Sequence, residues 1–214
     1  MEKKAILEQA KAIACKRDNT KEDRSGVYLE QAEEILLNYL KEHPHDTEAW
    51  LMLMMIEWTP PLEDLERIIK WARAILAYDP TNAYAFLVLA EAHWFYGGIT
   101  EDIYVQLDTA KNDDPNVMAM IEIAKAKYLE YKEGAEDEYE RVLKKSIEYG
   151  PEQARNYHML GKLYIKQGKI KEGEEVLKKG LENEEKAKLL YGDSEDEYDP
   201  TSLTQFLNEW YTGL

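Results

Sequence analysis

Four histidines and one cysteine are the side chains with which this sequence could most readily bind a metal. His43 and His45 stand on either side of Pro44, while His93, His158 and Cys15 are far apart along the chain. A protein metal site needs three or four converging ligands. A histidine pair around a proline at a helix boundary is more typical of an exposed turn. We therefore predict no metal and no cofactor.

Carboxylates are abundant but not arranged in a catalytic motif. They cluster in EDEYE at 136–140 and SEDEYD at 194–199. Such charge runs are usually solvated faces or tails, and a hydrolase would need two carboxyl groups that converge in a cleft. The glycine-rich phosphate loop, the paired-histidine metalloprotease motif and the nucleophile elbow do not occur. We predict a protein that is not an enzyme, and a hydrolase is the least favoured of three hypotheses.

The net charge limits the classes of partner that this protein can bind. The 214 residues include 43 acidic and 27 basic side chains, a formal net charge of −16. This balance disfavours nucleic acid and anionic membrane surfaces, which attract basic proteins, and it favours a basic protein or peptide. Cys15 allows no intrachain disulfide, and no stretch approaches the ~20 apolar residues of a membrane span. We expect a soluble cytoplasmic protein.

Prolines mark an internal repeat. Four segments end alike in proline, at intervals of 36, 35 and 36 residues. Proline commonly follows the end of a helix because it cannot continue it. A new helical pattern follows each one, then a break, then a second amphipathic helix. The unit is therefore a helical hairpin of about 35 residues. The prolines are Pro44, Pro80, Pro115 and Pro151.

The segment 157–181 has helical spacing yet contains four glycines. A glycine inside a helix costs roughly 1 kcal/mol relative to alanine. We predict that Gly161, Gly173 and Gly180 allow two helices to approach closely. Gly168 lies where a turn is expected, and there a positive φ is accessible to glycine.

This segment resembles the tetratricopeptide-repeat (TPR) family. Tyr157, Leu160, Gly161 and Tyr164 match the aromatic, Leu-Gly and Tyr pattern of its first helix. Gly173 and Leu177 match the small–large pair of its second helix. The other repeats match more loosely. The resemblance implies an all-α, right-handed α-solenoid of about five helical hairpins with one concave face.

The layout follows from these patterns. Helices are expected near 2–17 and 27–43, followed by four hairpins. We assign residues 1–190 to the repeat domain, 191–202 to an acidic linker and 203–214 to a C-terminal amphipathic helix. The apolar stripe of that tail comprises Leu203, Phe206, Leu207, Trp210 and Tyr211. The four hairpins are expected at 46–79, 82–114, 117–150 and 153–187.

The family's ligands usually lie along the concave face, so the resemblance also implies a peptide-binding groove. It would be aromatic in its middle and basic at its C-terminal end. Some members grip chaperone carboxylates with a Lys–Asn clamp, but the corresponding positions here hold Leu51, Met55, Leu87 and Glu91. That ligand is therefore not expected. We predict Trp50 and Phe86 to be core residues. The groove residues are Leu51, Met55, Trp58, Tyr84, Leu87, Glu91, Trp94, Phe95, Met118, Ile121, Lys125, Tyr128, Arg155, His158, Lys162 and Lys166.

Two functional hypotheses lead. The first is an interaction module or adaptor that binds a peptide or helix in its groove. The second is an acidic inhibitor or immunity-type protein that blocks a basic partner such as a nuclease.

The C-terminal tail must cover its apolar stripe. It does so either on the last hairpin or in the groove, of the same chain or of a neighbour, and the latter would give self-association.

Overall fold

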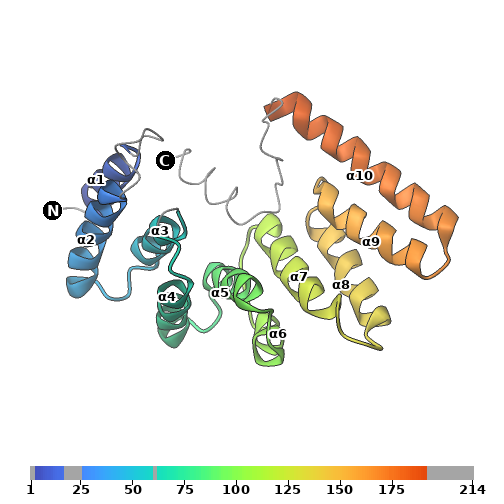
Figure 1. Cartoon of the computed structure of the whole chain (residues 1–214), viewed down its shortest axis with the longest axis horizontal. Helices are drawn as coiled ribbons and strands as arrows, with labels where there is room; N and C mark the ends of the chain where they lie inside the picture. The colour runs from blue at the N-terminus through green and yellow to red at the C-terminus, as the bar shows by residue number, and fades with distance from the viewer. Residues whose placement is uncertain (1–2, 17–25, 60–61, 192–214) are drawn as a thin grey trace. The chain divides into compact units, whose positions relative to one another are not determined.

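The structure, a computed structural model, describes residues 3–16, 26–59 and 62–191, with side chains up to residue 186. These residues form ten α-helices and no β-strand, which confirms the predicted all-α class (Figure 1). The helices are α1 Lys3–Ala14, α2 Val27–Glu42, α3 Thr47–Trp58, α4 Leu65–Tyr78, α5 Ala83–Tyr96, α6 Glu101–Leu107, α7 Pro115–Leu129, α8 Glu136–Tyr149, α9 Ala154–Lys166 and α10 Ile170–Tyr191.

The chain divides into two compact units, one ending at Gly97 and the other beginning at Gly98. The first unit contains α1 to α5 and the second contains α6 to α10. The boundary falls inside the predicted hairpin 82–114. Both glycines there have positive φ, 138° and 116°.

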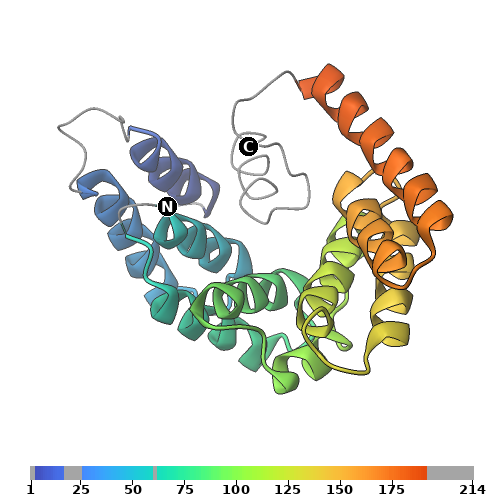
Figure 2. The ribbon, with the colours of Figure 1, turned by 45° about the vertical axis from the view of Figure 1, so that its right-hand side comes forward.

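In the first unit, α1 pairs with α2, α3 with α4, and α5 packs on α4 (Figure 2). Three helices begin at side-chain caps. Asp46 Oδ1 accepts from the Ala49 amide at 3.2 Å, and Asn82 Oδ1 accepts from the Ala85 amide at 2.9 Å. Asp64 caps α4 in the same way. Such caps satisfy amides that have no partner within the helix, so each of these three helices starts at a defined residue.

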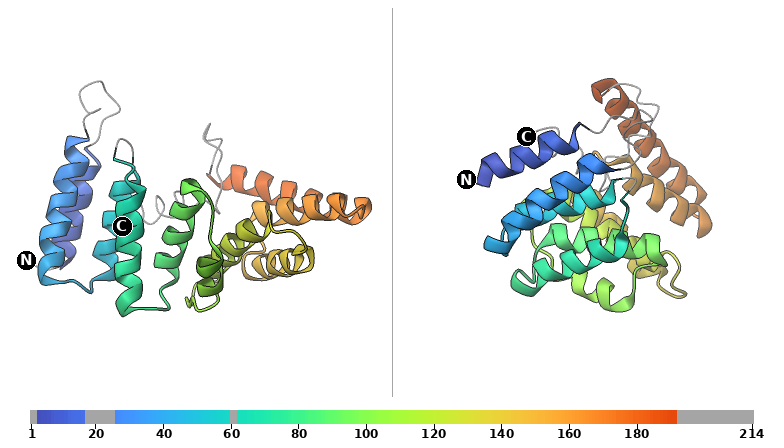
Figure 3. Two further views of the ribbon diagram at one scale, coloured as in Figure 1. Left: turned by 60° about the horizontal axis from the view of Figure 1, so that its bottom comes forward. Right: turned by 60° about the vertical axis from the view of Figure 1, so that its left-hand side comes forward.

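In the second unit, α7 pairs with α8 and α9 with α10 (Figure 3). A core joins these helices to α6. Its buried residues are Tyr104, Ile123, Ala126, Leu129, Tyr139, Val142, Leu143, Leu160 and Leu163.

The predicted glycine roles agree with the geometry of α9 and α10. A Cβ atom at Gly161 would lie 2.6 Å from Leu177 Cγ, and one at Gly173 would lie 2.7 Å from Ile165 Cγ1. Gly168, by contrast, lies in the turn with φ +80° and open space around it. Three helical glycines therefore permit close packing, and the fourth permits the turn.

The prolines mark the repeat with one difference. Pro44, Pro80 and Pro151 follow the ends of α2, α4 and α8, as predicted. Pro115 instead opens α7, and Asp114 caps that helix by accepting from the Asn116 amide at 2.8 Å. Proline suits the first turn of a helix because its missing amide hydrogen is not needed there.

Two helices differ in length from the expectation. Helix α6 has 7 residues and ends at Leu107, far short of 114. Thr109 Oγ1 donates to the Gln106 carbonyl at 2.7 Å, and Asn and Asp residues with low helix propensity follow. Helix α10 has 22 residues and extends to Tyr191, where the acidic linker was expected to begin.

Candidate functional site

The predicted groove residues of α3 and α5 divide into buried and accessible ones. Leu51, Met55 and Leu87 are buried. Tyr84, Glu91, Trp94 and Trp58 are half-buried, and Phe95 is exposed. The buried group reflects the composition of α3 and α5, which are apolar on all sides, and a helix of this kind is enclosed on all sides. The accessible residues gather toward the ends of the two helices.

Trp58 and Phe95 meet at these helix ends. Their rings pack edge to face, with centroids 5.9 Å apart and an interplanar angle of 72°. Next to Phe95, the Tyr96 hydroxyl donates to Glu66 Oε1 at 3.1 Å, and this hydrogen bond raises the pKa of Tyr96. Phe95 remains 65% exposed and Tyr96 63% exposed. We call Trp58, Phe95 and Tyr96 the aromatic edge.

Tyr96 was not among the predicted groove residues. The sequence signal for it was the run of three aromatics at 94–96, which cannot all face one way on a helix. Large aromatic side chains held by neighbours yet open to solvent are typical of interaction surfaces. The aromatic edge is therefore the strongest candidate site in the first unit.

A cavity of about 520 Å³ lies between α1 and α3 of the same unit. Its apolar floor is Leu7 and Met52. Its rim is charged, but much of that charge is paired: Lys3 Nζ lies 2.7 Å from Glu48 and 3.1 Å from Asp46. These contacts raise the pKa of Lys3, with the hydrogen bond to Glu48 as the largest cause. The lining residues are Lys3, Lys4, Leu7, Glu8, Lys11, Glu48 and Met52.

Two of the four predicted groove residues of α7, Lys125 and Tyr128, contact α6 or the residue that follows it. Lys125 is 2% exposed, and its Nζ lies 2.5 Å from Asp108 Oδ1 and 3.3 Å from Glu122 Oε2. Tyr128 stacks on Tyr104 with centroids 4.6 Å apart. These two side chains therefore join α7 to α6. Of the remaining predictions on this helix, Met118 is half-buried and Ile121 buried.

The predicted residues of α9 keep a basic, accessible surface. Lys162 and Lys166 are exposed, and within the described part of the chain neither forms an ion pair. Arg155 and His158 are half-buried. His158 packs against α10, since a Cβ atom at Gly180 would lie 2.6 Å from its Cδ2.

The predicted tail residues Leu203, Phe206, Leu207, Trp210 and Tyr211 lie outside the described residues, as does the linker after Tyr191. The two aromatic residues that were predicted to lie in the core differ in burial. Phe86 is 2% exposed, whereas Trp50 is only half-buried and lines a groove. Trp50 is held at the surface because its Nε1 donates to the Pro44 carbonyl at 2.9 Å.

The two neighbouring histidines contact different helices. His43 packs on Tyr39 of α2 with ring centroids 4.3 Å apart, and His45 packs on Tyr78 of α4 at 4.7 Å. Among the residues with described positions, no group of three His, Cys, Asp or Glu side chains is arranged to hold a metal. None of the described helices has the length and apolarity to cross a bilayer.

Comparison with known proteins supports the fold. No protein-family model matches the sequence, and no curated protein matches it. Solved structures do match. Two crystal structures of MamA align with TM-scores of 0.54 and 0.55 at 21% and 20% identity. They cover 79% and 88% of this chain, and 96% and 97% of their own.

A third match is TTC0263, a thermophilic TPR protein in Thermus thermophilus. It aligns with a TM-score of 0.52 at 18% identity, over 89% of this chain and 97% of that chain. Identities this low establish a shared fold and nothing more specific. The chain thus has the helical-repeat fold of a TPR protein, as the sequence pattern predicts.

Proposed function

We propose that this chain is a non-enzymatic interaction protein that binds an apolar peptide or helix of a partner, with the aromatic edge as its anchor. The observation that carries the proposal is the exposure of Phe95 and Tyr96, 65% and 63%, although both rings are fixed by neighbours. A prearranged aromatic side chain loses little conformational freedom on binding. A TPR-like fold suits such a role because its function lies in the surfaces that its stacked hairpins present.

The experiment compares partners captured by three forms of the full chain. The forms are wild type, Phe95→Ser/Tyr96→Ser, and a control with Val105→Ser, which removes an equally exposed apolar side chain from α6 (59% exposed). Quantitative mass spectrometry identifies proteins captured by wild type and control but lost with the double variant. For such a protein, we expect calorimetry to show at least tenfold weaker binding by the double variant. Equal binding by all three forms would refute the proposal.

We propose that the C-terminal tail, 203–214, binds the predicted peptide groove of a second copy of this chain. The alternative, a cap on the last hairpin, is less needed, because α10 already exposes mainly charged side chains. Terminal repeats need a polar outer face of this kind. Sedimentation of the full chain over a range of concentrations should show self-association that Phe206→Ser/Trp210→Ser removes. A monomer at all concentrations would contradict it. The exposed charged residues of α10 are Lys171, Glu172, Glu174, Glu175, Lys178, Lys179, Glu182, Glu185 and Lys186.

The second candidate function is inhibition of a basic protein by an acidic surface. The net charge of −16 supports it. Charge steers such associations, so the association rate should fall steeply between low and high salt. Association that is insensitive to salt would instead favour apolar binding at the aromatic edge.

A further inference from the structure

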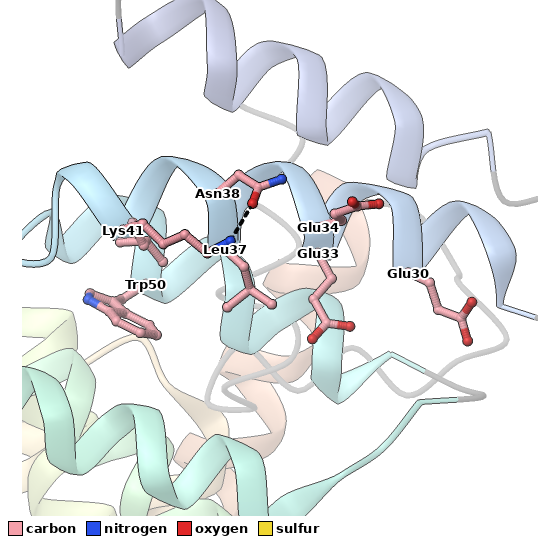
Figure 4. A pocket seen from close by; sticks show the side chains of 8 residues that line it. Glu30, Glu33, Glu34, Leu37, Asn38, Lys41 and Trp50 are labelled. Carbon is pink, nitrogen blue, oxygen red and sulfur yellow. Dashed lines mark hydrogen bonds between the residues drawn. The ribbon is translucent and has the colours of Figure 1, made fainter.

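A groove of about 540 Å³ runs along α2 in the first unit (Figure 4). Its apolar lining is Leu37 and Leu40 of α2 together with Trp50 of α3. Lys41 lies close to Trp50, whereas Glu33, Glu34 and Glu30 follow in the other direction along α2 (Figure 4). The groove therefore has an apolar end and an acidic end. It lies on the second helix of its hairpin, whereas the predicted peptide groove follows the first helices.

Trp50 forms a fixed wall at the apolar end. Its Nε1 donates to the Pro44 carbonyl at 2.9 Å. Its ring also packs on Trp71 of α4, with centroids 6.2 Å apart. The Arg67 guanidinium lies 4.8 Å from the centroid of Trp71 and makes a cation–π contact with that ring. An anchored, half-buried tryptophan is the kind of residue that contributes most of the binding free energy when a partner's apolar side chain packs on it.

At the acidic end, one carboxylate is buried in an ion pair and two are exposed. Glu33 is buried and forms an ion pair with Arg67, which also lies 3.2 Å from Glu57 Oε2. Glu30 and Glu34 are exposed, one helical turn apart, and have no ion-pair partner among the described residues. Two exposed carboxylates therefore lie at this end of the groove.

We propose that this groove binds a basic segment of a partner protein. An apolar side chain of the segment packs on Trp50 and Leu37, and a lysine or arginine pairs with Glu30 and Glu34. Leu37 and Glu30 are two helical turns apart, about 10 Å, which an extended peptide spans in about three residues. The matching ligand thus carries an apolar residue and basic residues about three positions apart. This inference rests on the proposed interaction function, but it assigns a different surface and a charged ligand.

The test uses the full chain and two labelled synthetic peptides that place a lysine pair three residues from a leucine, one in each order. Fluorescence anisotropy gives their affinities for wild type and for Glu30→Gln/Glu34→Gln. The matched control is Glu174→Gln/Glu175→Gln, which removes two exposed carboxylates of α10. We expect saturable binding of at least one peptide that weakens five- to twentyfold in the groove variant and stays unchanged in the control. The binding should also weaken from 50 to 500 mM salt. Circular dichroism confirms that each variant is folded.

A second variant tests the apolar end. Leu37→Ser should weaken the same peptide at least threefold, and a peptide with glutamates in place of lysines should not bind. Absence of binding by wild type at 1 mM peptide, or equal affinities of wild type and the groove variant, would overturn the inference. Loss of binding only with Phe95→Ser/Tyr96→Ser would also overturn it, because the peptide would then bind the aromatic edge. That last result would leave the proposed interaction function standing.

Discussion

Gly161 of α9 faces Leu177 of α10 so closely that a Cβ atom at position 161 would lie 2.6 Å from Leu177 Cγ. The relationship is mutual, since a Cβ atom at Gly173 would lie 3.0 Å from the Gly161 carbonyl oxygen. The backbones of the two helices are in contact at this point. A larger residue at either position requires the side chain of Leu177 or Ile165, or the helices themselves, to move.

Gly161→Ala should therefore destabilise the protein, although alanine is the better helix former by about 1 kcal/mol. Overpacking of a tight contact costs about 1–3 kcal/mol. After the gain in helix propensity is subtracted, we expect a net loss of up to about 2 kcal/mol in the free energy of unfolding, measured in urea. Lys162→Ala, on the exposed side of the same helix, should leave it within about 0.5 kcal/mol. In a Leu177→Ala background, Gly161→Ala should cost less. An equal cost in both backgrounds would show that Leu177 is not the obstacle.

Much of the fold could be predicted because helix punctuation is local. The spacing of Pro44, Pro80 and Pro151 and the glycines of α9 and α10 indicated the hairpins and their close packing. The spacing predicts Pro115 after the end of a helix, but it opens α7. Proline suits both the residues just after one helix and the first turn of the next. The environment of Lys125 could not be predicted, because its partner Asp108 lies just after the end of α6 and the spacing of residues along α7 does not reveal such a pairing.

Lys125 should be important for stability. Its Nζ lies 3.3 Å from Glu122, and both side chains are 2% exposed. Removing one partner of a buried ion pair costs roughly 3–5 kcal/mol. Lys145 also contacts Glu122, at 2.5 Å, so we expect Lys125→Met to lose roughly 2–3 kcal/mol in urea unfolding. Lys125→Met/Glu122→Gln should recover part of this loss. A double variant less stable than the single one would contradict the assigned pairing.

Glu57 should make stability depend on pH. Burial, with a smaller contribution from the Asp64 charge, raises the pKa of Glu57 to about 7 from 4.5. Burial outweighs the opposing effect of Arg67, whose Nη1 lies 3.2 Å from Glu57 Oε2. Between these values the folded protein holds a proton that the unfolded chain releases, so the free energy of unfolding falls as the pH rises. Glu57→Gln removes this dependence. Urea unfolding should give similar stabilities for the variant and wild type at pH 5 and a more stable variant at pH 8. A difference that does not change with pH would show that Glu57 does not titrate in this range.

The candidate binding surfaces were less predictable than the fold. The aromatic residues of α3 and α5 indicated an interaction surface, but exposure depends on which neighbours cover each ring. Phe95 is open and Phe86 closed, although both lie on α5. Trp50 was expected in the core, and only the contacts with Pro44 and Trp71 show why it lines a groove.

Asn156 should be essential for the connection between α8 and α9. Its side chain is fully buried, and its Nδ2 lies 3.2 Å from the Ser146 carbonyl and 3.1 Å from Gln153 Oε1. The Ser146 carbonyl, in the last turn of α8, also accepts from the Gly150 amide at 2.8 Å, so Asn156 is its second donor. The same Asn156 amide group is the donor to the buried Gln153 Oε1. Asn156→Ala leaves the buried Gln153 Oε1 without this donor, at a cost of about 1–3 kcal/mol. Thermal unfolding should show a lower Tm for Asn156→Ala. The effect should be smaller for Tyr157→Phe, which removes the exposed hydrogen bond from the Tyr157 hydroxyl to the Pro151 carbonyl. If the two variants melt alike, the buried amide contributes no more to stability than a surface hydrogen bond.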